Sequence, residues 1–399
     1  MQVSQEVNSF GYIVRFKTGT TDLDVAINTE TKMKNKANVI LRRKKPRYNV
    51  VPVVSNVFDT IKAFSIPLVS DEYIAALETD ADILSIEPDI EVSAYAQTVP
   101  WGVTRIGTSS STVADIDGDG SVSATNIFIL DTGVAPNHPD LNRFAARSFV
   151  PRESSVDDLN GHGTAVAGVA AARDNAEGIV GVCPGAKIHS YKCLDRGGSG
   201  QLSWIIAAIE AVSTWKSALP SGSTERAVVN MSLGGYVGSF AYTSLDYAVQ
   251  SLVAKGVPVV VAAGNSADLA GLYTPAHTTE AITVGAYDSG NNIASFSNYG
   301  EVVDILAPGV NILTTGINTR SRKPTYVTYS GTSFSAPHVA GAVALYLTKN
   351  PGALPEDIST ALKTYGTNAN TANTSPLITN KSSFPNTTQV SVYVSEIDV

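Results

Sequence analysis

The chain has 399 residues, of which 43% are hydrophobic and 16% charged, with a formal net charge of −8 and a pI near 5.2. This composition supports a sizeable core, and the length suggests roughly two or three domains. The negative charge argues against nucleic acid or an anionic membrane as a partner. No apolar run approaches the roughly 20 residues of a membrane helix. The first residues lack the basic start and apolar stretch of a signal peptide, although one could have been removed.

Residues 1–95 predict a separate small α/β unit. We expect a strand at 11–16, a helix at 71–78 with an acidic first turn, and another strand at 83–86. A basic run from Lys32 to Arg47 interrupts this unit. It is typical of a solvated loop, with a nucleic-acid patch or a second processing site as the alternatives.

From about residue 125 the sequence alternates between apolar strands and helices. We expect strands at 126–130, 188–194, 228–233, 257–263 and 281–286, and helices at 162–172, 202–215, 245–254 and 332–347. This order predicts an α/β fold, a doubly wound parallel sheet with helices on both faces. Sites on such sheets form outside the carboxyl ends of the strands, where Asp131, Ser232 and Asn265 would lie.

Three glycine-rich segments carry an acid, a base and a nucleophile. They are ILDTG at 129–133 with Asp131, NGHGT at 160–164 with His162, and GTS at 331–333 with Ser333. A serine hydroxyl is a weak nucleophile at neutral pH unless a base is adjacent. Each segment alone is also typical of a turn, a structural histidine or a helix cap. All three in the order Asp, His, Ser favour nucleophilic serine catalysis.

These segments and their order resemble the subtilisin-like serine endopeptidases, the subtilase family. The resemblance implies that Asp131 orients the ring of His162, that His162 acts as general base, and that Ser333 attacks the peptide bond. Asn265, in AAGNS at 262–266, would donate to the oxyanion together with the backbone N–H of Ser333. The alternative is a catalytically silent protein of the same fold, used for binding or held as a permanently inhibited complex.

Further segments resemble the peptide-binding strands and the primary pocket of the family. Main-chain pairing predicts broad selectivity, and small pocket walls predict a preference for bulky apolar or aromatic side chains. The candidate substrate-binding residues are Gly198, Ser199, Gly200, Ser232, Leu233, Gly234, Ala262, Ala263 and Gly264.

The N-terminal unit resembles the ferredoxin-like inhibitor propeptide of the family, followed by a mature N-terminus. We therefore expect self-cleavage between Tyr95 and Ala96, a catalytic domain at 96–370, and a polar C-terminal extension at 371–399 that could pack as a strand on it. The resemblance implies a monomeric zymogen that is secreted or extracytoplasmic. Its partners would be peptide and protein substrates and its own propeptide.

Candidate calcium ligands fall in three places. The alternating acids of 115–120 resemble a calcium loop, but position twelve is Asn126 instead of glutamate, so an acidic turn is the alternative. The family resemblance implies two more structural sites that take no part in catalysis. The candidate ligands are Asp115, Asp117 and Asp119 in the loop, then Gln97, Asp140 and Asn175, and finally Asp304.

Two further expectations concern sulfur. Cys183 and Cys193 lack a metal-type spacing and predict two reduced, buried thiols, with a disulfide as the alternative. Phe334 stands where subtilases commonly have methionine, directly after the catalytic serine. A phenyl ring has no oxidisable thioether, so we expect the activity to tolerate mild peroxide.

Overall fold

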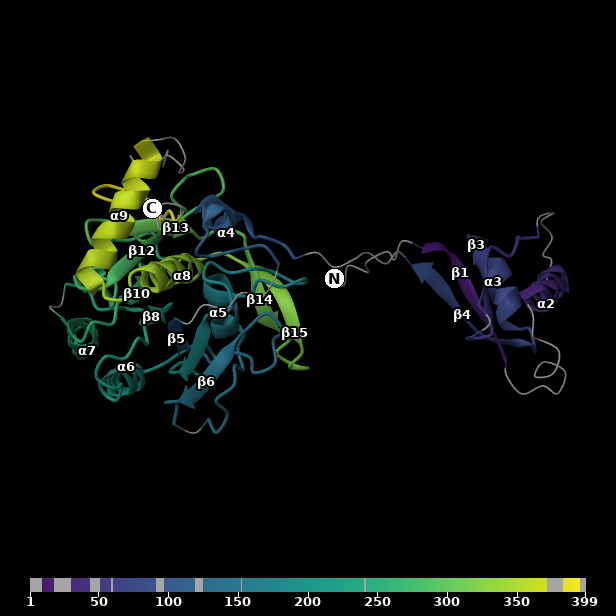
Figure 1. Ribbon diagram of the computed structural model, residues 1–399, viewed down its shortest axis with the longest axis horizontal. Coiled ribbons are helices and arrows are strands. Elements are labelled where there is room, and N and C mark those ends of the chain that lie inside the picture. Colours follow the sequence, from purple (N-terminus) through teal and green to yellow (C-terminus); the bar gives the residue numbers. More distant parts are fainter. Residues whose placement is uncertain are drawn as a thin grey trace. The chain divides into compact units, whose positions relative to one another are not determined.

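The computed structural model describes residues 9–17, 30–43, 51–58, 60–90, 97–118, 125–151, 153–239, 242–371 and 383–394. The chain divides into two compact units, Met1–Ala94 and Tyr95–Val399, and each is described by itself (Figure 1). The expected boundary after residue 95 lies next to this division. Within the described ranges, no helix combines the length and the apolar character that a membrane crossing requires.

The N-terminal unit is an antiparallel sheet with two helices packed on it. Its elements are β1 (Ser9–Phe16), α2 (Glu30–Arg43), β2 (Val57–Phe58), β3 (Ala63–Pro67), α3 (Asp71–Glu78) and β4 (Ile83–Ile90). The strand order is β2-β3-β1-β4, so that β1 pairs with both β3 and β4. This β-α-β-β-α-β order is that of the ferredoxin-like fold.

The expectation of a solvated loop for the basic run is wrong for the part that the structure describes. Residues 30–43 form helix α2, and the remainder of the run, to Arg47, lies outside the described residues. Met33, Ala37, Ile40 and Leu41 recur at helical spacing and are buried against the sheet. The basic residues lie between these positions, so charge content concealed an amphipathic helix.

The second unit is built on a seven-stranded sheet of order β13-β12-β10-β8-β5-β7-β6 in which every described pairing is parallel. Its strands are β5 (Asn126–Asp131), β6 (Arg143–Ser148), β7 (Lys187–Lys192), β8 (Ala227–Met231), β10 (Val259–Ala262), β12 (Ile282–Tyr287) and β13 (Ile305–Pro308). Its covering helices are α5 (His162–Ala171), α6 (Leu202–Ser217), α7 (Ser244–Ala254) and α8 (Thr332–Lys349).

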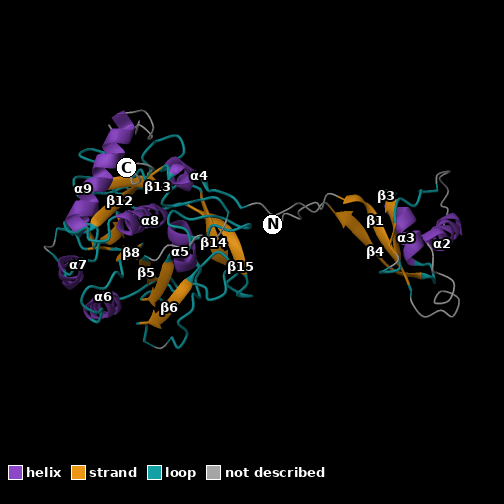
Figure 2. Ribbon diagram, in the orientation of Figure 1, coloured by secondary structure: helices purple, strands orange, loops and turns teal. Residues whose placement is uncertain are grey.

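Helices cover both faces of this sheet (Figure 2). Alternate side chains of β5 show the division: Ile127 and Ile129 belong to the core under α5 and α8, whereas Phe128 and Leu130 belong to the core under α6 and α7. A strand buried on both sides has no polar face, which explains the continuous apolar runs. The predicted fold class is confirmed for this unit.

The remaining elements surround the sheet. They are α4 (Trp101–Arg105), the 3₁₀ turns Thr108–Ser110 and Ala270–Leu272, β9 (Gly235–Tyr236), β11 (Tyr273–Thr274), β14 (Ile312–Ile317), β15 (Pro324–Tyr329) and α9 (Pro355–Thr371). Strand β9 pairs with β11, and β14 with β15, both antiparallel. Helix α9 continues through a polar stretch to Thr371.

The C-terminal segment lies along the outer edge of the sheet. Leu306 of β13 donates its N–H to Val390 O at 2.8 Å, and Val392 returns a hydrogen bond to Leu306 O at 2.9 Å. These form one parallel bridge at Ser391, so the described part of the C-terminal extension pairs with the sheet at a single position and not as a full strand. Val392 and Val394 are fully buried, so the segment covers an edge that would otherwise be open.

Candidate active site

Asp131 is the last residue of β5 and is fully buried. Its Oδ1 accepts hydrogen bonds from the backbone N–H of Thr132 at 2.7 Å and from Nδ1 of His162 at 2.8 Å. A carboxylate without such donors would be costly to bury at the end of an apolar strand. The acid and the imidazole that the sequence predicted as partners are therefore in direct contact.

His162 is the first residue of α5, and its surroundings fix where that helix begins. Gly161 before it has φ 106°, a backbone conformation that glycine adopts without strain. Deeper in the helix, the hydroxyl groups of Thr314 and Thr315 in β14 donate to carbonyl oxygens of α5 at 2.6 and 2.7 Å. A Cβ at Gly168 would lie 2.2 Å from Thr315 Oγ1. The small residues of α5 thus let the helix dock closely and hold the imidazole over Asp131.

The electrostatics favour a charged His162. Burial lowers the pKa of this imidazole, but the charge and hydrogen bond of Asp131 outweigh burial, and Asp158 adds a smaller effect. The pKa of His162 is consequently raised above its ordinary 6.5. A base that holds a proton more firmly is a better acceptor for the proton of an attacking hydroxyl.

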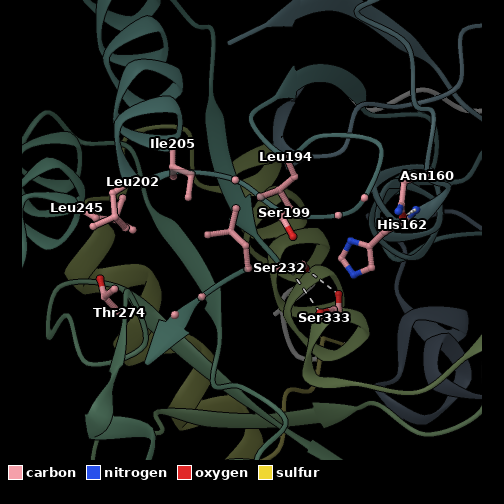
Figure 3. A pocket seen from close by; sticks show the side chains of 16 residues that line it. Asn160, His162, Leu194, Ser199, Leu202, Ile205, Ser232, Leu245, Thr274 and Ser333 are labelled. Carbon is pink, nitrogen blue, oxygen red and sulfur yellow. Dashed lines mark hydrogen bonds between the residues drawn. The ribbon is translucent and has the colours of Figure 1, made fainter. Parts of the chain in front are cut away.

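Ser333 is the second residue of α8 and faces the same pocket as His162 (Figure 3). In this structure its hydroxyl donates to the carbonyl oxygen of Ser232 at 3.4 Å, and not to His162. The carbonyl oxygen of Ser333 accepts the hydroxyl of Ser232 at 2.7 Å. That carbonyl is free to do so because Pro337, four residues on, has no N–H. Ser232 therefore anchors the backbone that carries Ser333, while the Ser333 side chain can rotate toward the imidazole.

Asn265 follows β10 and is held in one orientation. Its Oδ1 accepts both the backbone N–H and the hydroxyl of Thr332, at 2.8 and 2.9 Å. Because the oxygen is engaged, the Nδ2 group is the end left to donate. Asn265, Thr332 and Ser333 line one pocket, and the first N–H groups of α8 point from the same helix end. Two kinds of donor thus converge where an oxyanion would form.

Two cavities contain all nine candidate substrate-binding residues. A pocket of about 180 Å³ is lined by Ser232 to Gly234 on one side and Ala262 to Gly264 on the other. A groove of about 580 Å³ runs past His162 and Ser333 between Ser232 to Gly235 and Gly197 to Gly200. Their contact with a substrate remains a prediction. Four apolar residues of the groove were not predicted from sequence, namely Leu194, Leu202, Ile205 and Leu245 (Figure 3).

One set of candidate calcium ligands is gathered around a side-chain amide. Nε2 of Gln97 lies 2.7 Å from Arg173 O, 3.2 Å from Ile179 O and 3.4 Å from Asn175 Oδ1. Asn175 in turn donates to Asp140 at 3.3 Å. Carboxylate, amide and carbonyl oxygens are the donors that Ca²⁺ takes. Rotation of the Gln97 amide would add its oxygen to this set, so these residues fit the ion.

The other two sets are arranged differently. Asp304 accepts the ammonium group of Lys363 at 2.7 Å, so its charge is already neutralised in this structure. In the 115–118 segment, the backbone N–H groups of Asp117 and Gly118 donate to buried Asp174. Asp119, Tyr95 and Ala96 lie outside the described residues. Among those described, no three acidic, histidine or cysteine side chains form a metal-binding group. Cys183 and Cys193 are both buried and form no disulfide, as expected.

Comparison with known proteins agrees with this geometry. The model of the subtilase family matches residues 123–381. The chain belongs to the subtilase family. An alkaline protease of Alkalihalobacillus alcalophilus is 41% identical over 79% of this chain and 77% of its own length. Subtilisin Savinase of Lederbergia lenta is 41% identical over 70% of this chain and 95% of its own.

A solved structure shares the fold of this subtilase. It is the crystal structure of a cold-adapted subtilisin-like serine proteinase, with a TM-score of 0.59 and 30% identity, covering 76% of this chain and 99% of the other. The predicted enzyme class, a serine endopeptidase, is confirmed by these relatives.

Proposed function

We propose that this subtilase cleaves peptide bonds through an acyl-enzyme on Ser333. The hydroxyl oxygen attacks the carbonyl carbon of the substrate while His162 Nε2 accepts its proton, and Asp131 keeps the ring in place. Collapse of the tetrahedral intermediate breaks the C–N bond, and the imidazolium returns the proton to the leaving amine. Water then hydrolyses the ester by the same route. The observation that carries this proposal is the 2.8 Å contact between His162 and Asp131 beside the Ser333 pocket.

Asn265 and the backbone N–H of Ser333 would stabilise the oxyanion. The amide of Asn265 is oriented before substrate arrives, because Thr332 holds its oxygen. Donors that need no rearrangement favour the charge that develops only in the transition state.

The pocket supports a preference for bulky apolar or aromatic side chains before the scissile bond. Its walls are short stretches of small residues, Ser232 to Gly234 and Ala262 to Gly264, and its volume is about 180 Å³. The groove beside it, which includes Leu194, Leu202, Ile205 and Leu245, would take side chains further from the cleaved bond. Selectivity would be broad, since extended peptides bind such edges mainly through their main chain.

We also propose that the chain is made as a zymogen that processes itself between Tyr95 and Ala96. The ferredoxin-like unit supports an intramolecular inhibitor role. The similarity to alkaline proteases and subtilisins supports a monomeric enzyme that is secreted or otherwise works outside the cytoplasm on protein substrates. Gln97, Asp140 and Asn175 would hold a structural calcium ion, which would stabilise their loops and take no part in bond cleavage.

The alternative is a silent binding protein of the same fold. We would express the full chain and the Ser333→Ala variant and compare them by gel and by N-terminal sequencing. The proposal expects the parent to yield a shorter chain beginning at Ala96, while the variant remains at 41.8 kDa. A fluorophosphonate should label the parent at Ser333. A parent that stays intact and unlabelled would support the silent alternative.

A further inference from the structure

A second carboxylate lies next to the pair of Asp131 and His162 and was not predicted from the sequence. Asp158 precedes His162 by four residues and is only 2% exposed. Its Oδ1 accepts the backbone N–H groups of Asn160 and Gly161 at 2.9 and 2.8 Å, and the hydroxyl of Thr132 at 2.9 Å. Its Oδ2 accepts the N–H and the hydroxyl of Thr164 at 2.9 and 2.6 Å. Five donors therefore surround one buried carboxylate.

These donors include the turn that carries His162. The first N–H groups of a helix have no partner within the helix, and the Gly161 cap has no side chain to supply one. Thr164 N–H is taken by Asp158 directly. Gly163 N–H is taken by the Thr132 hydroxyl at 3.0 Å, and His162 N–H by Asn160 at 3.2 Å. Asp158 holds both of these acceptor residues, so it organises the whole first turn of α5.

The same carboxylate is linked to the other member of the pair. Thr132 donates its backbone N–H to Asp131 at 2.7 Å and its hydroxyl to Asp158 at 2.9 Å. One residue thus bridges the two acids, and the end of β5 is joined to the start of α5 by hydrogen bonds. The separation of Asp131 and His162 is set by this bridge as well as by their own contact.

The charge of Asp158 also reaches the imidazole. Among the described residues no lysine, arginine or histidine side chain forms an ion pair with it, and Arg322 contacts only its backbone oxygen, at 3.3 Å. Its negative charge is balanced by N–H and O–H groups and by the positive end of α5. It contributes to the raised pKa of His162.

We propose that Asp158 is a positioning residue for the catalytic base: it fixes the turn bearing His162 against Asp131 and places a second negative charge near the imidazole. The inference rests on the proposed function of His162. It makes Asp158 necessary for the turnover rate and not for substrate binding, because the groove is lined by other residues.

The test compares Asp158→Asn with Asp157→Asn in the full chain. Both remove one negative charge, but Asp157 is 42% exposed at its side chain and pairs with Arg143, away from the imidazole. An asparagine at 158 presents N–H groups to Thr164, which is itself a donor, so the turn should shift. We expect kcat to fall by roughly 10- to 100-fold with KM within about two-fold, since a displacement of about 1 Å can cost about 100-fold.

A pH profile separates positioning from simple loss of fold. The rate at which a fluorophosphonate labels Ser333, normalised to folded protein, should show its acidic limb shifted to lower pH in Asp158→Asn and unshifted in Asp157→Asn. Asp158→Glu keeps the charge, so its limb should stay while its rate falls. If Asp158→Asn does not fold, Thr132→Val breaks the bridge with both acids intact and should lower the rate without moving the limb.

Two results would overturn the inference. One is a normalised labelling rate and acidic limb in Asp158→Asn equal to the parent. The other is an equal shift in both asparagine variants, which would indicate a general charge effect. A parent chain that is not labelled at Ser333 would instead contradict the proposed function, so the two failures are distinguishable.

Discussion

Among the described residues of the C-terminal unit, two aspartate–histidine pairs have similar geometry, and one of them faces the groove that Ser333 lines. His162 Nδ1 lies 2.8 Å from Asp131, and His277 Nε2 lies 2.9 Å from Asp246. Both carboxylates are fully buried, and both rings have an aromatic neighbour. Short distance and burial therefore do not distinguish a catalytic base from a structural histidine.

The difference lies in the remaining hydrogen-bonding groups. His277 Nδ1 lies 3.2 Å from Gly271 O, so both of its ring nitrogens face oxygen atoms. Asp246 also accepts from Thr243, Thr274 and Thr278 at 2.6 to 2.8 Å. In the other pair, Nε2 of His162 opens on the pocket that Ser333 lines. A catalytic pair needs a nitrogen that the protein leaves unengaged.

The largest effect expected from this comparison is on turnover. His162→Ala should lower kcat on the order of 10⁶-fold, the size measured on subtilisin, a member of the same family. His277→Ala should leave the kcat of folded enzyme within about two-fold. Steady-state kinetics normalised to folded protein would measure both.

The effect on stability should have the opposite order and be larger for His277→Ala than for His162→Ala. His277→Ala leaves a buried carboxylate without its ring partner and should lower the free energy of unfolding by roughly 3 kcal/mol. His162→Ala should cost less, because its ring is 28% exposed against 9% for His277 and water can reach the space it leaves. Denaturant unfolding of inhibited protein would measure this. Equal losses of activity in the two variants would contradict the distinction.

The proposed reacting groups could be found in the sequence because each one ends or begins an element with a strong pattern. Asp131 closes an apolar strand, and His162 and Ser333 open helices of small residues. Hydrogen bonds between distant segments leave no such pattern. Asp158 satisfies backbone groups, which the sequence does not mark, and Lys363 meets Asp304 across 59 residues. The helical spacing of α2 was available in the sequence but was outweighed by its basic charge.

The two pairs should also differ in what they make dependent on pH: the pair at His162 should set the pH dependence of activity, and the pair at Asp246 should contribute to that of stability. The proposed mechanism requires neutral His162, whose pKa is lowered by burial but raised above 6.5 by Asp131. Below that pKa, kcat/KM should fall by about 10-fold for each pH unit. A profile of kcat/KM from pH 5 to 9 would measure this limb. A limb centred well below 6.5 would contradict the assigned role of Asp131.

Stability should decline over a lower range. Burial raises the pKa of Asp246, but the hydrogen bonds from His277 and the threonines outweigh burial, so the pKa of Asp246 lies below its ordinary 3.8. Its contribution is therefore present above pH 3.8 and lost as the pH falls through its folded pKa. Burial lowers the pKa of His189 and of His338 to about 4, so their protonation in the unfolded state should remove up to roughly 3 kcal/mol each between pH 6.5 and 4. As the pH is lowered, unfolding should therefore occur at a lower pH than the loss of activity.

The smallest expected effect, on the sensitivity of the enzyme to oxidation, concerns the aromatic residues that pack against the two histidine rings. Phe334 lies edge-on to His162 with ring centroids 5.6 Å apart, and it stacks on Tyr329 at 5.3 Å. Subtilases commonly have methionine at this position, and its sulfoxide would place a polar group beside Ser333. Mild peroxide should leave kcat/KM within about two-fold here, because the described methionines, Met33 and Met231, are fully buried. Phe334→Met should become sensitive under the same treatment, as judged by residual activity and by the mass of the peptide containing Ser333. Rapid inactivation of the parent, with oxidation in that peptide, would contradict this expectation, because a group other than a thioether would then be oxidised beside His162. His277, whose ring centroid lies 5.5 Å from that of Tyr242, has no part in turnover, so oxidation beside it should leave kcat/KM unchanged.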